Sequence, residues 1–473
     1  MTDLTEQIQA LTDESKKLSR LIGEAKKKGL DTADELIAQK KAVQASIAEL
    51  EARATPESSD SEQPDSAGNA AATGKGGPGT GTVAAESPAK AKREPSDAER
   101  LQALIPPVYT AASESAESAQ PAAAYACEVS EVSPPGWDDF VRQHPRATLY
   151  HESMWLRTVA ETMGHQVAYV SCYFEADADR QLQSALPMIR QKSRLFGDIW
   201  TSIPLVNYGG ALSVDKHAEK HVLKAAADFA RASGASHLEV RGYHKQPTGW
   251  PERTDKVNMW LPLPADSKTL WKGFSSKVRS QIRKGQQNDY QSRIGGAELL
   301  DDFYRVFSEN MRDLGTPVYG KAFFAGILKN FGSSAKLIVI YSKGQPASCG
   351  FLVEQSTGAV KLLEIPWAST RQAFNSQNMN MVMYWEILSH AADTGFDLFD
   401  FGRSSKDAGT YRFKKQWGAM PVQLYWHYAL FQADELPAVN NNNPKFKLLV
   451  AMWQRLPLWL ANRLGPAIVK YIP

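Results

Sequence analysis

The strongest local signal for chemistry is the stretch FDFGRSSKDAGTYRFKKQWGAMP at residues 399–421. An apolar run ends at Asp400, a polar turn with Arg403 and Ser404 follows, and a short helix carrying Lys414 is expected next. Where a strand end feeds a helix start, free backbone N–H groups and the helix dipole favour anions. The stretch therefore predicts a site for a phosphate or a developing oxyanion. A solvated surface turn is the structural alternative.

A second cationic segment is SSKVRSQIRKGQ at residues 275–286. On a helix, Arg279 and Arg283 stand four residues apart and point the same way. Two neighbouring guanidiniums suit a diphosphate or an RNA backbone. An exposed basic helix face explains the same pattern without a ligand.

Two turns complete the set of candidate segments. Asn207-Tyr208-Gly209-Gly210 follows a strand, and its glycines let the backbone approach a ligand closely. MRDLGTPVY at residues 311–319 combines a helix end with an X-Pro turn. Either turn can also be purely structural.

The elements that must position these side chains form an α/β pattern that begins near Cys127. The first block has a helix at 150–163, strands at 166–174 and 182–191, a helix at 216–232 and a strand at 237–243. The second has helices at 270–287, 297–313 and 321–330, strands at 336–342, 347–354 and 360–367, a helix at 379–392, a strand at 396–401, a helix at 409–417 and a strand at 422–430. The repeated order predicts a duplicated fold instead of a doubly wound sheet.

Two regions of different composition precede this α/β part. Residues 1–54 lack proline and carry apolar residues at helical spacing on both sides of Gly29, which predicts an antiparallel helical hairpin, a coiled coil, with its tip near residues 28–31. Residues 55–126 are rich in Ser, Ala, Pro and Gly and have few large apolar side chains. We expect them to form a disordered tether.

The tail at residues 436–473 is cationic and amphipathic, with no acidic residue after Glu435. Pro457 and Gly465 interrupt it, as expected for two short helices. Such a segment can lie on an anionic membrane surface. The alternative is a terminal helix packed on the second half of the chain.

The composition gives few further clues to function. With 473 residues, two or three folded units are expected, and a net charge of +2 points neither to nucleic acid nor to membrane as a whole. Cys127, Cys172 and Cys349 are far apart among apolar residues, so we expect buried free thiols and no metal site. The polar N-terminus and the lack of a long apolar run predict a cytoplasmic protein of bacterial type, with the inner membrane surface as an alternative location.

In combination, five segments resemble the FemABX family of aminoacyltransferases, and most of all the Fem-like proteins associated with exosortase (PEP-CTERM) and exopolysaccharide gene clusters. The segments are LPMIRQKSRLFG, SIPLVNYGG, RSQIRKG, MRDLGTPVY and FDFGRSSKDAGTYRFKKQWGA, which occur in order between Glu152 and His427. The resemblance implies two tandem GNAT-like acyltransferase domains, at residues 127–265 and 266–435. It also implies transfer of an amino acid from aminoacyl-tRNA to an amine of a peptidoglycan precursor, without a metal or redox cofactor.

The resemblance suggests a role for Lys414, and the chemistry of the motifs suggests roles for other residues, although no side-chain base stands out. Lys414 would be the cation that stabilises the tetrahedral oxyanion. Asp400 and Asp407 are weaker candidates for the base that deprotonates the acceptor amine. The remaining candidates would bind substrate: Arg279, Arg283, Arg403, Ser404, Tyr411, Arg412, Asn207 and Tyr208.

Two features bear on the acyl donor. Acyl-CoA-dependent acetyltransferases have an Arg/Gln-x-x-Gly-x-Gly/Ala turn before the central helix, but residues 368–380 read ASTRQAFNSQNMN, without glycine. This disfavours CoA. The N-terminal hairpin resembles the tRNA-binding arm of seryl-tRNA synthetase, which suggests RNA contacts by Lys26, Lys27 and Lys28 and makes seryl-tRNA a candidate donor.

Three hypotheses remain open from the sequence. The first is an aminoacyl-tRNA-dependent transferase that modifies a lipid-linked or nucleotide-linked envelope precursor. The second keeps the fold and makes the protein an N-acyltransferase for an exopolysaccharide or a lipid-linked sugar. The third is a non-catalytic envelope assembly factor that acts through hairpin and tail.

Overall fold

The computed structural model describes residues 95–109, 125–177, 179–193, 197–207, 209–357, 360–406, 408–433, 435–436 and 444–472. It also describes scattered positions between Gln7 and Ser46, and all of these are helical. The expected hairpin tip with Lys26, Lys27 and Lys28 lies outside the described residues. The chain divides into two compact units, residues 1–90 and 91–473, and both β-sheets belong to the second unit.

Sheet A occupies the first half of that unit and has the strand order β1-β2-β3-β4-β6-β15-β7, with β5 paired to β3. Among its described strands only β4 and β6 are parallel, and α6 (Lys216–Ala232) is the crossover between them. The strand bounds are β1 Tyr125–Ser130, β2 Gln166–Phe174, β3 Leu182–Ser193, β4 Gly197–Thr201, β5 Leu212–Ser213, β6 His237–Gly242, β7 Glu252–Arg253 and β15 Tyr425–Leu430.

Sheet B repeats this plan with the strand order β9-β10-β11-β12-β13-β8-β14. Again one pair of the described strands is parallel, β12 with β13, and α11 (Met379–Asp393) is the crossover. The strand bounds are β8 Lys256–Pro262, β9 Tyr290–Gly295, β10 Ala335–Ser342, β11 Gln345–Thr357, β12 Val360–Thr370, β13 Leu398–Ser405 and β14 Met420–Gln423. The predicted duplicated α/β fold is therefore confirmed.

The two halves exchange strands at their boundary. β8 begins before residue 265, where the first domain was expected to end, yet it lies in sheet B between β13 and β14. β15 comes from the end of the expected second domain and pairs with β6 and β7 of sheet A. The expected cut between residues 265 and 266 therefore does not separate the two sheets.

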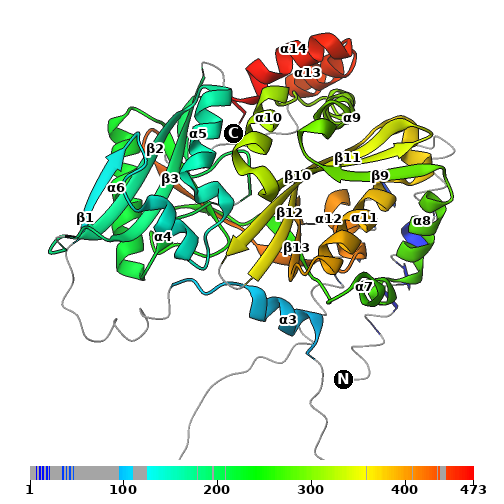
Figure 1. The fold of residues 1–473 in the computed structure, drawn as a ribbon, viewed down its shortest axis with the longest axis horizontal. Helices are drawn as coiled ribbons and strands as arrows, with labels where there is room; N and C mark the ends of the chain where they lie inside the picture. Colours follow the sequence, from blue (N-terminus) through cyan, green and yellow to red (C-terminus); the bar gives the residue numbers. More distant parts are fainter. Residues whose placement is uncertain are drawn as a thin grey trace, which may run out of the picture. The chain divides into compact units, whose positions relative to one another are not determined.

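Helices cover the sheets and join them into one body (Figure 1). An aromatic core continues from α5 to α10, with Trp155 against Phe323 and Phe331, because the apolar faces of both helices meet there. The helices not yet given are α4 Trp137–Gln143, η1 Leu149–His151, α5 Ser153–Met163, α7 Ser267–Gly273, α8 Ser276–Gln286, η2 Ala297–Leu299, α9 Leu300–Asp313, α10 Lys321–Phe331, η3 Gly332–Ser334, η4 Gln372–Gln377 and α12 Gly409–Gln416.

Part of the expected disordered tether is folded. α3 (Asp97–Leu104) starts with a capping box between Ser96 and Glu99, and it buries Leu101 against β8. Beyond the helix, the Tyr109 hydroxyl donates to Glu219 Oε2 of α6 over 2.7 Å. The prediction was wrong for residues 95–109, because the few apolar side chains of this polar segment pack against apolar residues of the second half.

The expectation of three free thiols was also wrong. β1 and β2 pair in a register that sets Cys127 opposite Cys172, and the two residues form a disulfide with a Cα–Cα separation of 4.1 Å. Their distance of 45 residues in sequence hid this pairing. Cys349 is a buried free thiol, as predicted.

The tail forms two short helices, α13 (Pro444–Gln454) and α14 (Leu458–Val469), which pack on α9. The Arg312 guanidinium donates to Leu456 O, and Asn462 Nδ2 donates to Ser308 Oγ. In the described part of the chain, no helix has the length and hydrophobicity required to cross a bilayer.

Candidate functional site

Lys414 lies on α12, directly beside the end of β13. Phe413 and Trp417 anchor this helix by packing against Tyr384 of α11. The Lys414 side chain is only 8% exposed, and its Nζ donates to Gly402 O over 2.9 Å and to Arg403 O over 2.8 Å. The predicted cation is thus held at the strand end by two backbone carbonyls.

The protonation of Lys414 is set by its surroundings. Burial and the charge of Arg403 lower the pKa of Lys414, the charge of Asp400 raises it, and the net result is a pKa of about 8. An ammonium group has three N–H donors, and two of them point at the carbonyls. The protonated form retains a third donor for an oxyanion, and the neutral form offers a lone pair to an acceptor amine.

The parallel strands β12 and β13 separate next to Lys414. They pair only from Leu362↔Leu398 to Glu364↔Asp400, although both strands continue beyond this point. Gly402 has a φ of 76°, a backbone conformation that favours glycine. Asp400 is fully buried and accepts from Gly402 N over 2.6 Å and from Asn258 Nδ2 over 2.9 Å. These bonds fix the strand end, and such a buried carboxylate cannot reach an acceptor amine directly.

Asn207 comes from the first half and reaches the same place. A Cβ on Gly402 would lie 3.5 Å from Asn207 Nδ2 and 3.9 Å from Lys414 Nζ. The turn that carries Asn207 is held by a bond from Gly209 N to Arg241 O over 3.0 Å. The structure therefore brings Asn207 and Lys414 together across the two halves, whereas Tyr208 lies outside the described residues.

Arg403 extends from the same strand end toward sheet A. Its guanidinium stacks over Trp426 at 4.9 Å, and Arg241 stacks over Trp426 at 4.3 Å. Arg241 is paired with Glu239, whereas among the described residues the Arg403 side chain has neither a hydrogen bond nor an ion pair. Burial and the nearby charge of Arg241 together lower the pKa of Arg403 to about 10. An anionic ligand would relieve this repulsion.

A buried carboxyl pair lies behind this site. Glu364 is the register neighbour of Asp400 and accepts from the Tyr150 hydroxyl over 2.7 Å and from Gln355 Nε2 over 3.1 Å. Burial and the charge of Asp400 together raise the pKa of Glu364 to about 8. The pair therefore holds one proton at neutral pH. Because Tyr150 belongs to the first half, this cluster also joins the two halves.

The other predicted site residues lie on α8, β13 and α12 or outside the described residues. Arg283 lies on α8, and its guanidinium carbon is 5.4 Å from the centre of the Trp271 ring. Arg279 is half-buried on the same helix, which packs on α11. Ser404 is buried. The remaining three are Tyr411, which packs against the core of the second half, Arg412, which is exposed, and Asp407, which lies outside the described residues.

The turn before α11 has no glycine and folds as the 3-10 helix η4. Arg371 ties the turn to its neighbours, with Nε donating to Glu309 Oε2 over 3.0 Å and Nη1 donating to Pro346 O over 3.1 Å. Asn378 then begins α11 with a φ of 55°. The site of a CoA pyrophosphate cradle is thus occupied by a different turn with its own contacts.

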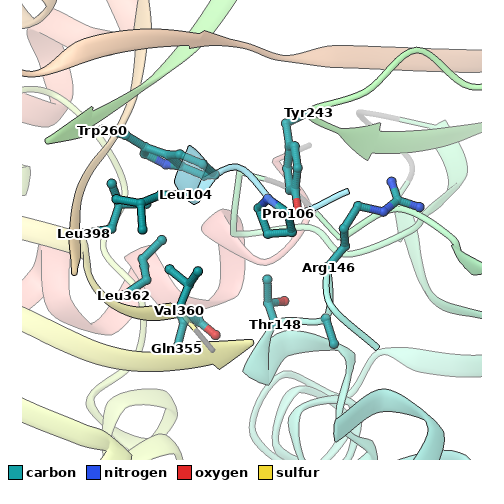
Figure 2. A pocket seen from close by; sticks show the side chains of 11 residues that line it. Leu104, Pro106, Arg146, Thr148, Tyr243, Trp260, Gln355, Val360, Leu362 and Leu398 are labelled. Atoms are coloured by element: carbon teal, nitrogen blue, oxygen red, sulfur yellow. The ribbon is translucent and has the colours of Figure 1, made fainter. Parts of the chain in front are cut away.

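A small cavity lies between the halves, under the segment after α3 (Figure 2). Pro106 stands between Arg146 of the first half and Trp260 of the second, and Tyr243 and Thr148 close the space on two further sides. Its volume is about 20 Å³, room for one water molecule. We therefore regard this cavity as a packing gap between neighbouring elements and not as a substrate pocket.

Sequence reasoning missed several of these residues. Glu364 had a detectable signal, because it is a lone carboxyl in the apolar strand VKLLEIPW. Arg241 and Trp426 had none, since only the exchange of β15 into sheet A brings them together with Arg403. Tyr150 and Gln355 likewise depend on contacts more than 200 residues apart.

Comparison with known protein families gives a match to part of the second half. Residues 272–415, which include Lys414, match the acetyltransferase (GNAT) domain family. The fold is that of two tandem GNAT-like halves, and the protein is an acyltransferase. Among curated proteins, none matches the sequence.

Several solved structures have a similar fold, among them the following three. The crystal structure of FemX matches with 14% identity over 68% of this chain and 100% of that chain, at a TM-score of 0.48. L-PGS from Bacillus licheniformis matches with 11% identity over 69% and 98%, at 0.43. A tandem GNAT protein from the clavulanic acid biosynthesis pathway matches with 10% identity over 66% and 100%, at 0.42. Similarities this loose carry no argument about substrates.

Proposed function

We propose that the protein transfers an aminoacyl group from aminoacyl-tRNA to an amine of a cell-envelope precursor of the peptidoglycan type. The observation that carries this proposal is the turn before α11, which lies inside an acyltransferase domain but lacks the glycines of a CoA cradle. A donor other than CoA must then bring its own activation. An aminoacyl ester is already activated, so positioning and charge stabilisation are the main requirements.

The proposed reaction needs few side chains. The acceptor nitrogen attacks the ester carbonyl, and a tetrahedral oxyanion forms. The C–O bond to the ribose then breaks, the amide remains, and the proton lost by the nitrogen ends on the ribose hydroxyl. Lys414, with its third N–H donor, would stabilise the oxyanion. Asn207, beside Gly402, would orient the group that enters from the first half.

Cationic side chains suit both anionic substrates. Arg403, free of hydrogen-bond partners among the described residues, would bind a phosphate or a carboxylate of the precursor. Arg279 and Arg283 of α8 would contact precursor phosphates or the RNA backbone. Lys26, Lys27 and Lys28 are proposed to bind tRNA, and the resemblance of their hairpin makes seryl-tRNA the first donor to test. The reaction would take place at the inner membrane surface if the precursor is lipid-linked.

The test is a direct search for the product. Full-length protein is incubated with charged total tRNA, labelled in the amino acid, and with a lipid extract of bacterial envelopes, and the labelled product is identified by mass spectrometry. We expect label in an amide of an envelope precursor. RNA should copurify with the wild-type protein and be lost when residues 1–54 are removed.

A second function is favoured by the matched family itself, whose members are acetyltransferases. The protein would then be an N-acyltransferase that modifies an exopolysaccharide or a lipid-linked sugar. Transfer of label from acyl-CoA, with none from aminoacyl-tRNA, would support this function and exclude the first.

A further inference from the structure

The two tail helices leave an apolar ridge on the surface of the protein. The ridge consists of large side chains that are mostly open to solvent, and Trp459 is the most exposed of them at 68%. Its members are Leu448, Leu449, Met452, Trp459 and Leu464. Five exposed large apolar side chains on two consecutive helices indicate an interaction surface, whereas single exposed apolar residues are common.

The opposite face of the same helices is firmly packed. Ala461, Gly465 and Val469 of α14 are buried, and a Cβ on Gly465 would lie 2.8 Å from Val318 N. In α13, Val450 packs so closely on Gly315 that a Cβ there would meet its side chain at 2.4 Å. The ridge is therefore held in a fixed orientation by the face that is buried.

The charged residues of the tail sequence all have one sign. Residues 436–473 contain five basic residues and no acidic residue. Arg455, in the turn directly after α13, and Arg463 of α14 are exposed. The basic residues are Lys445, Lys447, Arg455, Arg463 and Lys470.

We propose that α13 and α14 dock on the surface of an anionic phospholipid bilayer, with the ridge inserted at the level of the headgroups. Tryptophan is enriched at that depth, and each Lys or Arg near the surface gains attraction to anionic lipids. Helices of 11 and 12 residues are too short to span a bilayer but can lie in its interface. The inference is independent of the reaction proposed above.

A second copy of the chain is a less suitable occupant. In a symmetric dimer the same patch faces itself, so Arg455 and Arg463 of one copy would approach those of the other copy. No acidic residue of the tail would compensate for this repulsion. Anionic lipid headgroups supply the missing charge.

The test uses co-sedimentation of the full-length protein with vesicles of phosphatidylcholine alone or mixed with phosphatidylglycerol. We expect binding to the mixed vesicles that weakens with salt, and little binding to phosphatidylcholine. The double variant Leu449→Ser/Trp459→Ser should bind the mixed vesicles roughly tenfold more weakly, because most of the insertion is lost. Arg455→Gln/Arg463→Gln should also lose about tenfold and should respond more weakly to salt than the wild type.

Val132→Ser is the matched control, because Val132 is 74% exposed in the bend after β1 but lies outside the tail. It should bind like the wild type. Equal binding by wild type and double variant would overturn the proposal. So would a concentration-dependent dimer, detected by sedimentation velocity without lipid and abolished in the double variant. Because vesicle binding requires no turnover, a negative result here leaves the proposed reaction untouched, and an inactive enzyme leaves this inference untouched.

Discussion

Each half of the protein contains one parallel pair of described strands, and the two pairs differ in what lies beyond their last residue pair. In each sheet the parallel strand pair is matched over three residue pairs and then separates, β4 from β6 in sheet A and β12 from β13 in sheet B. In sheet A the chain itself closes the separation. Ser202 N donates to Glu239 O over 2.8 Å, and Gly209 N donates to Arg241 O over 3.0 Å. In sheet B both strands continue, and the Lys414 ammonium lies at the separation.

The difference suggests a division of labour after duplication. A strand separation closed by main chain contributes to stability, and one that receives a buried cation is available for chemistry. The turn that closes the first separation also carries Asn207 to the second. We therefore expect changes in sheet B to reduce activity first, and changes in the sheet A turn to reduce stability first.

The largest expected effect comes from removing the cation. Lys414→Ala should lower the rate of transfer by about 10²–10³-fold, the loss typical for one oxyanion donor. Since burying an ammonium group is unfavourable, the variant should still fold. Lys415→Ala is the matched control, because Lys415 is an exposed neighbour on the same helix.

The dependence of the rate on pH separates the two possible roles of Lys414. With a pKa of about 8, Lys414 loses its proton as the pH rises through that value, so a cation role predicts a rate that falls above pH 8. A rate that instead rises through this pH would assign Lys414 as the general base. An unchanged rate of transfer in Lys414→Ala would show that the strand separation in sheet B is not the catalytic site.

The buried carboxyl pair should give sheet B a dependence of stability on pH. The pKa of Glu364 rises from 4.5 to about 8 on folding, so the folded state binds more protons between these values, and stability falls as the pH rises through this window. Glu364→Gln should flatten that fall, by roughly 1–3 kcal/mol between pH 5.5 and 8.5, as measured by urea denaturation. Glu161→Gln, on the exposed side of α5, should leave the dependence as in the wild type. An unchanged slope in the Glu364 variant would refute the shared proton.

In sheet A, the turn should be sensitive to one methyl group. A Cβ on Gly209 would lie 2.4–2.7 Å from the buried side chain of Ile203, so Gly209→Ala should destabilise the protein by about 1–3 kcal/mol. Gly273→Ala, at the end of α7 with no atom within 4 Å of the added carbon, is the control and should change stability little. If Gly209→Ala abolished transfer in a protein of normal stability, the division between the halves would be wrong.

The smallest effect is expected where the halves meet. Arg403→Lys keeps the charge but loses the planar group that stacks on Trp426, so KM for the anionic substrate should rise about tenfold with little change in kcat. Lys406→Gln, exposed just beyond β13, serves as the control. A fall in kcat without a change in KM would assign Arg403 to the transition state instead of to substrate binding.

The sequence predicted most helices and strands, but it did not predict which distant residues would contact each other. Apolar periodicity and the repeated order of helices and strands predicted the duplicated fold, and the segment at residues 399–421 predicted the strand, turn and helix around Lys414. These features are local, because a strand end and the helix after it are set by neighbouring residues.

What the sequence could not predict depends on contacts between distant residues. The disulfide depends on the register of β1 and β2, and the Arg403–Trp426–Arg241 stack depends on the exchange of β15. The Tyr109 hydroxyl donates to Glu219, which lies 110 residues away in the sequence. Arg279 and Arg283 formed a convincing local pattern, yet the structure sets them on α8, apart from the contacts of Lys414.

The exchange of β15 also has a consequence for the order in which the protein folds during synthesis. Sheet A needs β15 between β6 and β7, and this strand ends at Leu430 of a chain of 473 residues. The half that is translated first therefore lacks one strand of its sheet until residues 425–430 have left the ribosome. An open strand edge of this kind is prone to pairing with other chains. Ribosomes that stall before Leu430 should thus release an aggregation-prone fragment and not an independent first domain.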